Sequence, residues 1–319
     1  MLRRARIEAS EPEPLDGAVL GRRLRGEAAL PMQGAKVVWP FAQMLRHAVI
    51  LGASGTGKTE TSMRIAAELA RTKGVQIFYL DAKGDRGSAQ RFTSLMAASG
   101  VETKVFPNQP FNSWKGDWRA IANRLLEVVE FVADGPAAYY RDVAKTVLQL
   151  ACFHPDGPPR SSRQLLARLD YEFLLDAHGP SSGILSVPRD GVAQVRMRYE
   201  AFFGQLGGAL DGDWGWNECD SAYLLLDSVS LGEDANAAAS MLFADFAYYF
   251  AQEKKPDRMC VLFVDEFAAI AGSSDLAIKV EQARGFNTAM VLVPQTPAGM
   301  GGVEQRARIL GSVETVICH

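Results

Sequence analysis

The sequence has few of the residues that build metal sites or disulfide frameworks. Its 319 residues include four cysteines and four histidines. The cysteines are widely separated without a Cys-x-x-Cys pair, and no histidine shares a helical or paired spacing with a cysteine or another histidine. The spacing therefore gives no indication of a zinc site, and we expect the cysteines to be buried reduced thiols.

Long apolar runs are also missing. No stretch approaches the roughly 20 apolar residues that a membrane-spanning helix needs. The arginine-rich start is followed by the polar stretch Glu8 to Pro14 instead of an apolar segment, which is unlike a secretory signal. The sequence therefore predicts a cytoplasmic protein that would associate with a membrane only through a partner.

An excess of positive charge is absent too. The formal net charge is -3 and the pI is about 5.9, which argues against a broadly basic surface that binds duplex DNA by charge alone. Any contact with nucleic acid must then be local. With 48% hydrophobic residues, the chain is long enough for one large α/β core and a smaller appended or inserted unit.

Short apolar runs alternate with helical patterns along most of the chain. This alternation predicts an α/β fold with a mostly parallel central sheet. From about residue 117 to 210 the spacing of apolar residues is helical throughout, so we expect an inserted all-α domain. The predicted units are an N-terminal arm with short strands over 1–46, a first part of the core over 47–114, the all-α domain over 115–219, and a second part of the core over 220–319.

A glycine-rich motif follows the first predicted core strand and precedes an amphipathic stretch. The segment fits the pattern G-x-x-x-x-G-K-[ST], and the context of strand, loop and helix is the one in which this pattern is meaningful. Backbone N–H groups of such a loop surround a β-phosphate at the positive end of the helix. The motif therefore predicts binding of ATP and Mg²⁺, with phosphates held by Gly52, Ala53, Ser54, Gly55, Thr56, Gly57 and Lys58, and with Thr59 as a magnesium ligand.

Two acids directly follow a buried strand far downstream. Four apolar residues, 261–264, precede Asp265 and Glu266, so both carboxylates are expected at the carboxyl end of the sheet, where ligands of open α/β sheets bind. We predict that Asp265 holds magnesium through a water. We predict that Glu266 orients and deprotonates the water that attacks the γ-phosphate.

Two further residues are candidates for sensing the nucleotide. Gln295 follows the predicted strand 288–293 and could bond the γ-phosphate or the attacking water, or could be an ordinary loop residue. Arg284 precedes the same strand at a helix end, where it could cap the helix. Alternatively, Arg284 could reach the γ-phosphate bound by an adjoining subunit, as an arginine finger does.

Taken in order, these motifs resemble the coupling-protein ATPases of conjugative type IV secretion, the TraD/TraG-like branch of the FtsK/HerA superfamily. The resembling segments are Asp81-Ala82-Lys83-Gly84-Asp85, Phe111-Asn112-Ser113-Trp114, Phe263 to Ala268, Ala283 to Phe286 and Val291 to Gln295. Two positions, Ala82 and Ser113, carry other residues where the family favours proline. The family's usual N-terminal membrane anchor has no counterpart in this sequence.

The resemblance implies a RecA-like P-loop NTPase core and a motor that translocates DNA. It implies a homo-hexameric ring, a single-stranded DNA or nucleoprotein substrate, relaxosome and secretion-channel partners, a trans finger role for Arg284 and a sensor role for Gln295. Two alternatives stay open: a HerA- or FtsK-like motor in DNA processing, and a nucleotide-dependent assembly switch that binds protein without moving DNA.

Overall fold

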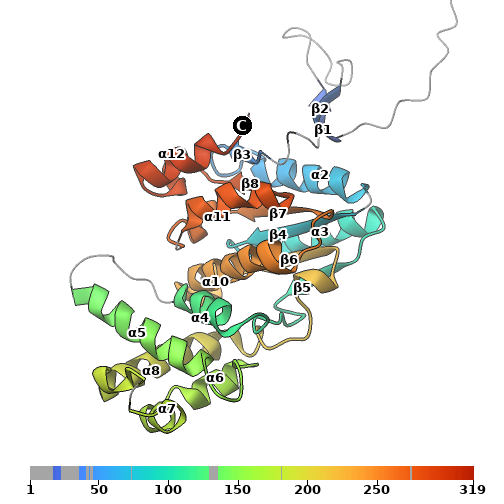
Figure 1. The fold of residues 1–319 in the computed structure, drawn as a ribbon. Coiled ribbons are helices and arrows are strands. Elements are labelled where there is room, and N and C mark those ends of the chain that lie inside the picture. The colour runs from blue at the N-terminus through green and yellow to red at the C-terminus, as the bar shows by residue number, and fades with distance from the viewer. Residues whose placement is uncertain are drawn as a thin grey trace, which may run out of the picture.

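The computed structural model describes residues 17–22, 36–40, 43, 46–72, 74–128, 136–180, 182–273 and 275–319. Seven strands form one sheet in the order β5-β6-β4-β7-β8-β3-β9, and every pair of neighbouring strands is parallel (Figure 1). This confirms the predicted α/β fold class. The strands are β3 (Ala48–Leu51), β4 (Val75–Asp81), β5 (Thr103–Phe106), β6 (Ser221–Leu225), β7 (Met259–Asp265), β8 (Thr288–Val293) and β9 (Thr315–Cys318).

Helices cover both faces of the sheet, which explains the continuous apolar runs of its strands. Because side chains of a strand alternate between faces, Tyr79 of β4 packs with one buried cluster and Phe78 with the other. Helices α2 (Lys58–Ala70) and α3 (Arg86–Ala98) contribute to the cluster with Tyr79. Helices α10 (Asp234–Tyr248) and α11 (Leu276–Ala283) contribute to the cluster on the opposite face. The short α9 (Ser228–Leu231) precedes α10, and α12 (Val303–Gly311) lies between β8 and β9 in the chain.

Between β5 and β6 the chain forms helices, as the apolar spacing predicted. They are α4 (Trp118–Leu126), α5 (Pro136–Cys152), α6 (Ser162–Arg168), α7 (Tyr171–His178) and α8 (Arg189–Leu206). In Figure 1, α5 to α8 project beyond the sheet, on the side of α10 and α4. Short turns complete the fold: η1 (Ile184–Ser186), η2 (Trp216–Glu218), the π-helical η3 (Tyr249–Glu253), η4 (Phe267–Ile270), η5 (Arg284–Phe286) and η6 (Pro297–Met300).

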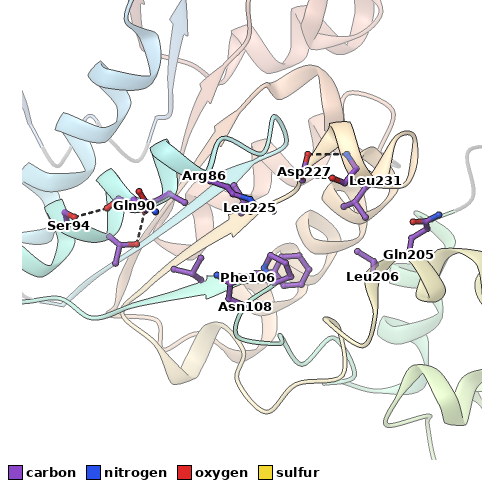
Figure 2. Close-up of a pocket in the computed structure, with 15 residues that line it drawn as sticks. Arg86, Gln90, Ser94, Phe106, Asn108, Gln205, Leu206, Leu225, Asp227 and Leu231 are labelled. Atoms are coloured by element: carbon purple, nitrogen blue, oxygen red, sulfur yellow. Dashed lines mark hydrogen bonds between the residues drawn. The ribbon is translucent and has the colours of Figure 1, made fainter.

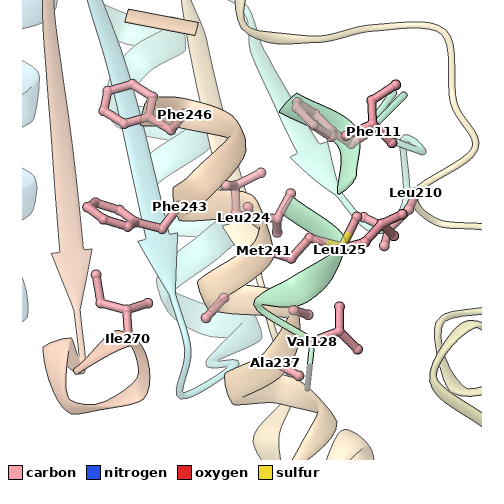
Figure 3. Close-up of a cluster of buried hydrophobic side chains, with 14 of the residues drawn as sticks. Phe111, Leu125, Val128, Leu210, Leu224, Ala237, Met241, Phe243, Phe246 and Ile270 are labelled. Carbon is pink, nitrogen blue, oxygen red and sulfur yellow. The ribbon is translucent and has the colours of Figure 1, made fainter. Parts of the chain in front are cut away.

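Helix α10 joins the helical segment to the sheet. Figure 3 shows Phe243 of α10 on the side of the strands and Met241 beside Leu125 of α4. These residues belong to one buried hydrophobic cluster that extends from the sheet into α5 and α8. Treating 115–219 as a separate domain therefore stays a prediction, because the two parts share this cluster.

A buried ion pair reinforces the same junction. Arg124 Nε of α4 lies 2.9 Å from Asp245 Oδ2 of α10, and both side chains are almost fully buried. The Asp245 carboxylate also accepts a hydrogen bond from Trp216 Nε1 at 2.9 Å. Nearby, Lys279 Nζ of α11 lies 2.8 Å from Glu127 Oε1 at the end of α4.

In the predicted N-terminal arm, β1 (Gly17–Arg22) and β2 (Lys36–Pro40) pair in antiparallel fashion. Apart from Gln43 and Arg46, the rest of 1–46 lies outside the described residues. Within the described parts, no helix has the length and apolar character to cross a bilayer. All four cysteines are free, as expected, but only Cys152 and Cys260 are buried: Cys318 lies on the edge strand β9 and is exposed.

Candidate nucleotide-binding site

The glycine-rich loop lies between β3 and α2, as predicted. Gly57 directly precedes α2 with φ of 97°, a left-handed backbone conformation that glycine adopts without a steric penalty. Lys58 is buried, and its Nζ donates to the carbonyl oxygens of Gly52 at 2.6 Å and Ala53 at 2.9 Å. The ammonium group thus sits within the curve of the loop, at the N-terminal end of a 13-residue helix.

The acidic strand brings its carboxylates to the same edge of the sheet. Strand β7 pairs in parallel with β4, with Asp265 directly opposite Asp81. Thr59 Oγ1 donates a hydrogen bond of 2.9 Å to Asp265 Oδ2. The two motifs predicted to share a magnesium ion, although 206 residues apart in sequence, are therefore in direct contact.

Glu266 and Gln295 also meet at this edge. Gln295 Nε2 donates to Glu266 Oε1 at 2.5 Å. Glu266 has φ of 58° and ψ of 54°, a left-handed conformation that costs a residue other than glycine about 1–3 kcal/mol and is frequent at functional sites. Strands β7 and β8 are neighbours, so the residues that follow them project to adjacent positions.

These residues surround a hollow of about 650 Å³. Residues of the glycine-rich loop, the acidic pair Asp265 and Glu266, and Gln295 line it. Lys83, Asp85 and Arg91, for which the sequence predicted no part in this site, line the hollow as well. Arg91 of α3 forms an ion pair with Glu60, the residue after Thr59 in α2.

The donor set suits magnesium held jointly with a nucleotide. A hydroxyl that donates its proton, as Thr59 does to Asp265, keeps lone pairs for a cation. Magnesium prefers such oxygen ligands and usually retains waters and substrate phosphates instead of entering a closed protein cage. Among the described residues there is no cluster of three or more His, Cys, Asp or Glu side chains that could hold a metal alone.

Two stacked tyrosines lie behind the carboxylates. The rings of Tyr79 and Tyr223 are parallel with centroids 5.0 Å apart. Tyr79 Oη donates to Asp265 Oδ2 at 3.1 Å, and Tyr223 Oη donates to Asp81 Oδ2 at 2.8 Å. Burial, reinforced by the charge of Asp265, raises the pKa of Tyr79 well above its usual value, so its phenol stays protonated and can donate.

Asp81 organises the turn after β4. Its carboxylate accepts from the backbone N–H groups of Lys83, Gly84 and Asp85. Burial raises the pKa of Asp81, whereas the hydrogen bonds from Tyr223 and from the turn oppose the rise. The segment Asp81 to Asp85, one of those that carry the family resemblance, is thus a carboxylate-bound turn that presents Lys83 and Asp85 to the hollow.

Arg284 does not line this hollow. It is exposed in η5, which precedes β8, so it lies at the amino end of the strand whereas the P-loop lies at the carboxyl edge of the sheet. Its backbone follows directly on α11, at the helix C-terminus. The finger role in another subunit stays a prediction.

A larger hollow of about 950 Å³ lies on the other side of α3 (Figure 2). Residues of α3, β5, α9 and the end of α8 line it, including Arg86, Phe106, Gln205 and Asp227. No residue of the glycine-rich motif or the acidic pair lines it. The residues predicted to bind nucleotide therefore line the smaller hollow and not the larger one.

The parallel sheet, the phosphate-binding loop and the acidic strand that touches it define a P-loop NTPase fold. Residues 27–102 match the family model described as "Helicase HerA-like C-terminal". No curated protein sequence matches the chain.

Solved structures share the fold. The bacterial conjugative coupling protein TrwBΔN70, in its trigonal form with sulphate, has a TM-score of 0.64 and 17% identity, over 88% of this chain and 72% of that one. TrwB in complex with ADP and Mg²⁺ has a TM-score of 0.61 and 18% identity, over 96% and 80%. VirB4 of Thermoanaerobacter pseudethanolicus has a TM-score of 0.62 and 13% identity, over 97% and 85%. The resemblance inferred from the sequence motifs is confirmed, and at these identities the structural likeness concerns the fold.

Proposed function

We propose that this chain is an ATPase that hydrolyses ATP with Mg²⁺ in the hollow between the glycine-rich loop and β7. The observation that carries the proposal is the contact of Thr59 with Asp265, because it joins a phosphate-binding loop to a magnesium-binding carboxylate. Neighbouring folds support it, since TrwB has been solved with ADP and Mg²⁺ and with a non-hydrolysable ATP analogue.

Each residue has a distinct part in this proposal. Backbone N–H groups of residues 52–57 and the N-terminus of α2 bind the β-phosphate, and Lys58 moves from its loop carbonyls to the β- and γ-phosphates. Thr59 and Asp265 hold Mg²⁺, which when bound neutralises charge on the phosphate oxygens. Glu266 accepts the proton of the attacking water, and Gln295, already bonded to Glu266, aligns that water or the γ-phosphate.

We further propose that hydrolysis drives DNA translocation by a homo-hexameric ring, with single-stranded or nucleoprotein DNA as substrate. The ordered coupling-protein motifs and the fold of TrwB support a role in delivering DNA to a conjugative secretion channel with relaxosome proteins. In this proposal the motor is cytoplasmic and reaches the channel through a partner. A ring needs only a few pore contacts per subunit, since grip is summed over subunits, so the net charge of -3 is compatible.

The test is steady-state ATPase activity with Mg²⁺, with and without single-stranded DNA, across salt concentrations. We expect Mg²⁺-dependent hydrolysis that DNA stimulates at low salt and that salt suppresses, because phosphate contacts release counterions. The matched control is Lys58→Ala, which should remove nucleotide binding or hydrolysis. Hydrolysis that DNA leaves unchanged at low salt would refute the motor but not the ATPase, and would favour the assembly switch. An unchanged rate in the lysine variant would refute the site.

A further inference from the structure

The hydroxyl group of Tyr79 contacts both halves of the nucleotide site. On one side its Oη donates to Asp265 Oδ2 at 3.1 Å, and on the other it lies 2.8 Å from Ser62 Oγ of α2. Ser62 follows Thr59 by one helical turn, and its Oγ is also 2.9 Å from the Thr59 carbonyl oxygen. Thr59 Oγ1 bonds Asp265 in turn, so these four residues form a closed ring of contacts.

Donor and acceptor roles in the ring follow from the carboxylate. Tyr79 donates its single hydroxyl proton to Asp265. Asp265 Oδ2 then receives two hydroxyl protons, from Thr59 and Tyr79, while Oδ1 accepts from the backbone N–H of Glu266 at 3.0 Å. Protein groups thereby hold both carboxylate oxygens in position.

The tyrosine ring is itself held firmly. It stacks between Tyr223, at 5.0 Å, and Phe263, at 5.8 Å, and a tilted Phe92 of α3 lies at 5.3 Å. Tyr79 is fully buried. Buried rings in such contact leave the hydroxyl little freedom, so its position is set by the core of the protein.

On this geometry, and on the proposed function, we infer that Tyr79 is a positioning residue that holds Asp265 for magnesium and ties β7 to the P-loop helix. Tyr79 is absent from the lining of the hollow, so its proposed action is through Asp265. Removing an outer-shell partner of a metal ligand typically lowers metal affinity or activity about 10–100-fold. The role of Tyr79 therefore predicts a change in magnesium dependence more than in the rate at saturating magnesium.

The chain supplies a matched control in Tyr223. Its ring is stacked on Tyr79 and the residue is equally buried, but its hydroxyl donates to Asp81, which does not line the hollow. Tyr79→Phe and Tyr223→Phe each delete one buried hydroxyl and preserve the stacked ring. Both should therefore lower stability by a similar amount, which separates a positional effect from a general loss of packing.

The experiment measures ATPase rate against Mg²⁺ concentration and, independently, the affinity for a fluorescent ADP analogue in Mg²⁺ and in EDTA. For Tyr79→Phe we expect the half-saturating Mg²⁺ concentration to rise about tenfold, with the rate at saturating Mg²⁺ within about twofold of wild type. The gain in ADP affinity on adding Mg²⁺ should shrink, while affinity in EDTA is unchanged. For Tyr223→Phe, whose partner Asp81 contacts neither Thr59 nor Asp265 through the bonds described, we expect a half-saturating Mg²⁺ concentration within about twofold of wild type, whatever its effect on the maximal rate.

A Tyr79→Phe protein with the magnesium dependence of Tyr223→Phe would overturn the inference. Ser62→Ala keeps the Tyr79 phenol but removes a contact that orients it, so we expect a smaller rise in the half-saturating Mg²⁺ concentration. The absence of a rise in both Tyr79→Phe and Ser62→Ala would also overturn the inference. A wild-type protein whose ADP binding ignores Mg²⁺ would instead refute the proposed function, so the two failures are distinguishable.

Discussion

The buried pair of Arg124 and Asp245 permits a quantitative prediction about how α4 is held on the core. Replacement of Arg124 by methionine leaves the Asp245 carboxylate buried, with the Trp216 N–H as its remaining hydrogen-bond donor. It also removes donors to the carbonyl oxygens of Ser113 and Lys115. Removing one partner of a buried pair costs about 3–5 kcal/mol, because the other charge stays uncompensated.

For a chain of 319 residues the unfolding entropy is about 0.7 kcal/mol/K, so this loss corresponds to a fall in Tm of about 4–8 °C. Thermal melting followed by circular dichroism measures it. The double variant Arg124→Met, Asp245→Leu removes both charges and should recover the part of the loss that comes from the uncompensated carboxylate, since apolar replacement of a buried pair is often neutral. The lost hydrogen bonds to the Ser113 and Lys115 carbonyl oxygens and from Trp216 are not restored.

The pH dependence has a definite sign. Burial raises the pKa of Asp245 and the charge of Arg124 opposes the rise, so the Arg124→Met change raises that pKa further. An acid whose pKa is raised on folding favours the folded state at low pH and loses that advantage as pH increases through the folded pKa. The deficit of the single variant relative to the double should therefore be small in acid and grow towards neutral pH. A deficit independent of pH, or a double variant as unstable as the single, would refute this reasoning.

Two further predictions concern catalysis. Glu266→Gln should bind ATP but stall turnover, because the amide cannot accept a proton from water. Filter binding of ATP, measured alongside the hydrolysis rate, would detect this. An unchanged rate would exclude Glu266 as the base. As an arginine finger, Arg284 predicts that Arg284→Ala lowers the ATPase rate about a thousandfold. In an equal mixture with Lys58→Ala subunits, about a quarter of the sites should regain activity, because there the intact loop of an Arg284→Ala subunit adjoins the intact arginine of a Lys58→Ala subunit. No recovery on mixing would contradict sharing of sites between subunits.

The sequence located the strands and both motifs because each carries a local signal. The loop pattern at 52–59 and the apolar run before Asp265 need no knowledge of neighbouring strands. The contribution of Tyr79 was not foreseen, because a tyrosine in a buried strand shows its partner only once β7 is known to lie beside β4. A partial signal existed: Tyr79 and Asp81 are two residues apart and so lie on one face of the strand.

Other features depend on tertiary arrangement in the same way. Arg124 and Asp245 pair although they are 121 positions apart in the sequence, and no local pattern in either helix indicates this pairing. The exposure of Cys318 follows from the place of β9 at the sheet edge, whereas its apolar neighbours suggested burial. Arg284 could be assigned to a helix end from sequence, and that placement holds.

The position of α10 between the sheet and α4 has a consequence for how the molecule melts. Ten of its fifteen residues are buried, and they contact both the sheet and the helical segment. The polar, solvent-exposed face of α10 is therefore too small for the helix to stay folded without these neighbours. Separating the helical segment from the sheet would expose α10 to water together with its polar pair. The two parts should therefore denature together, in a single calorimetric peak.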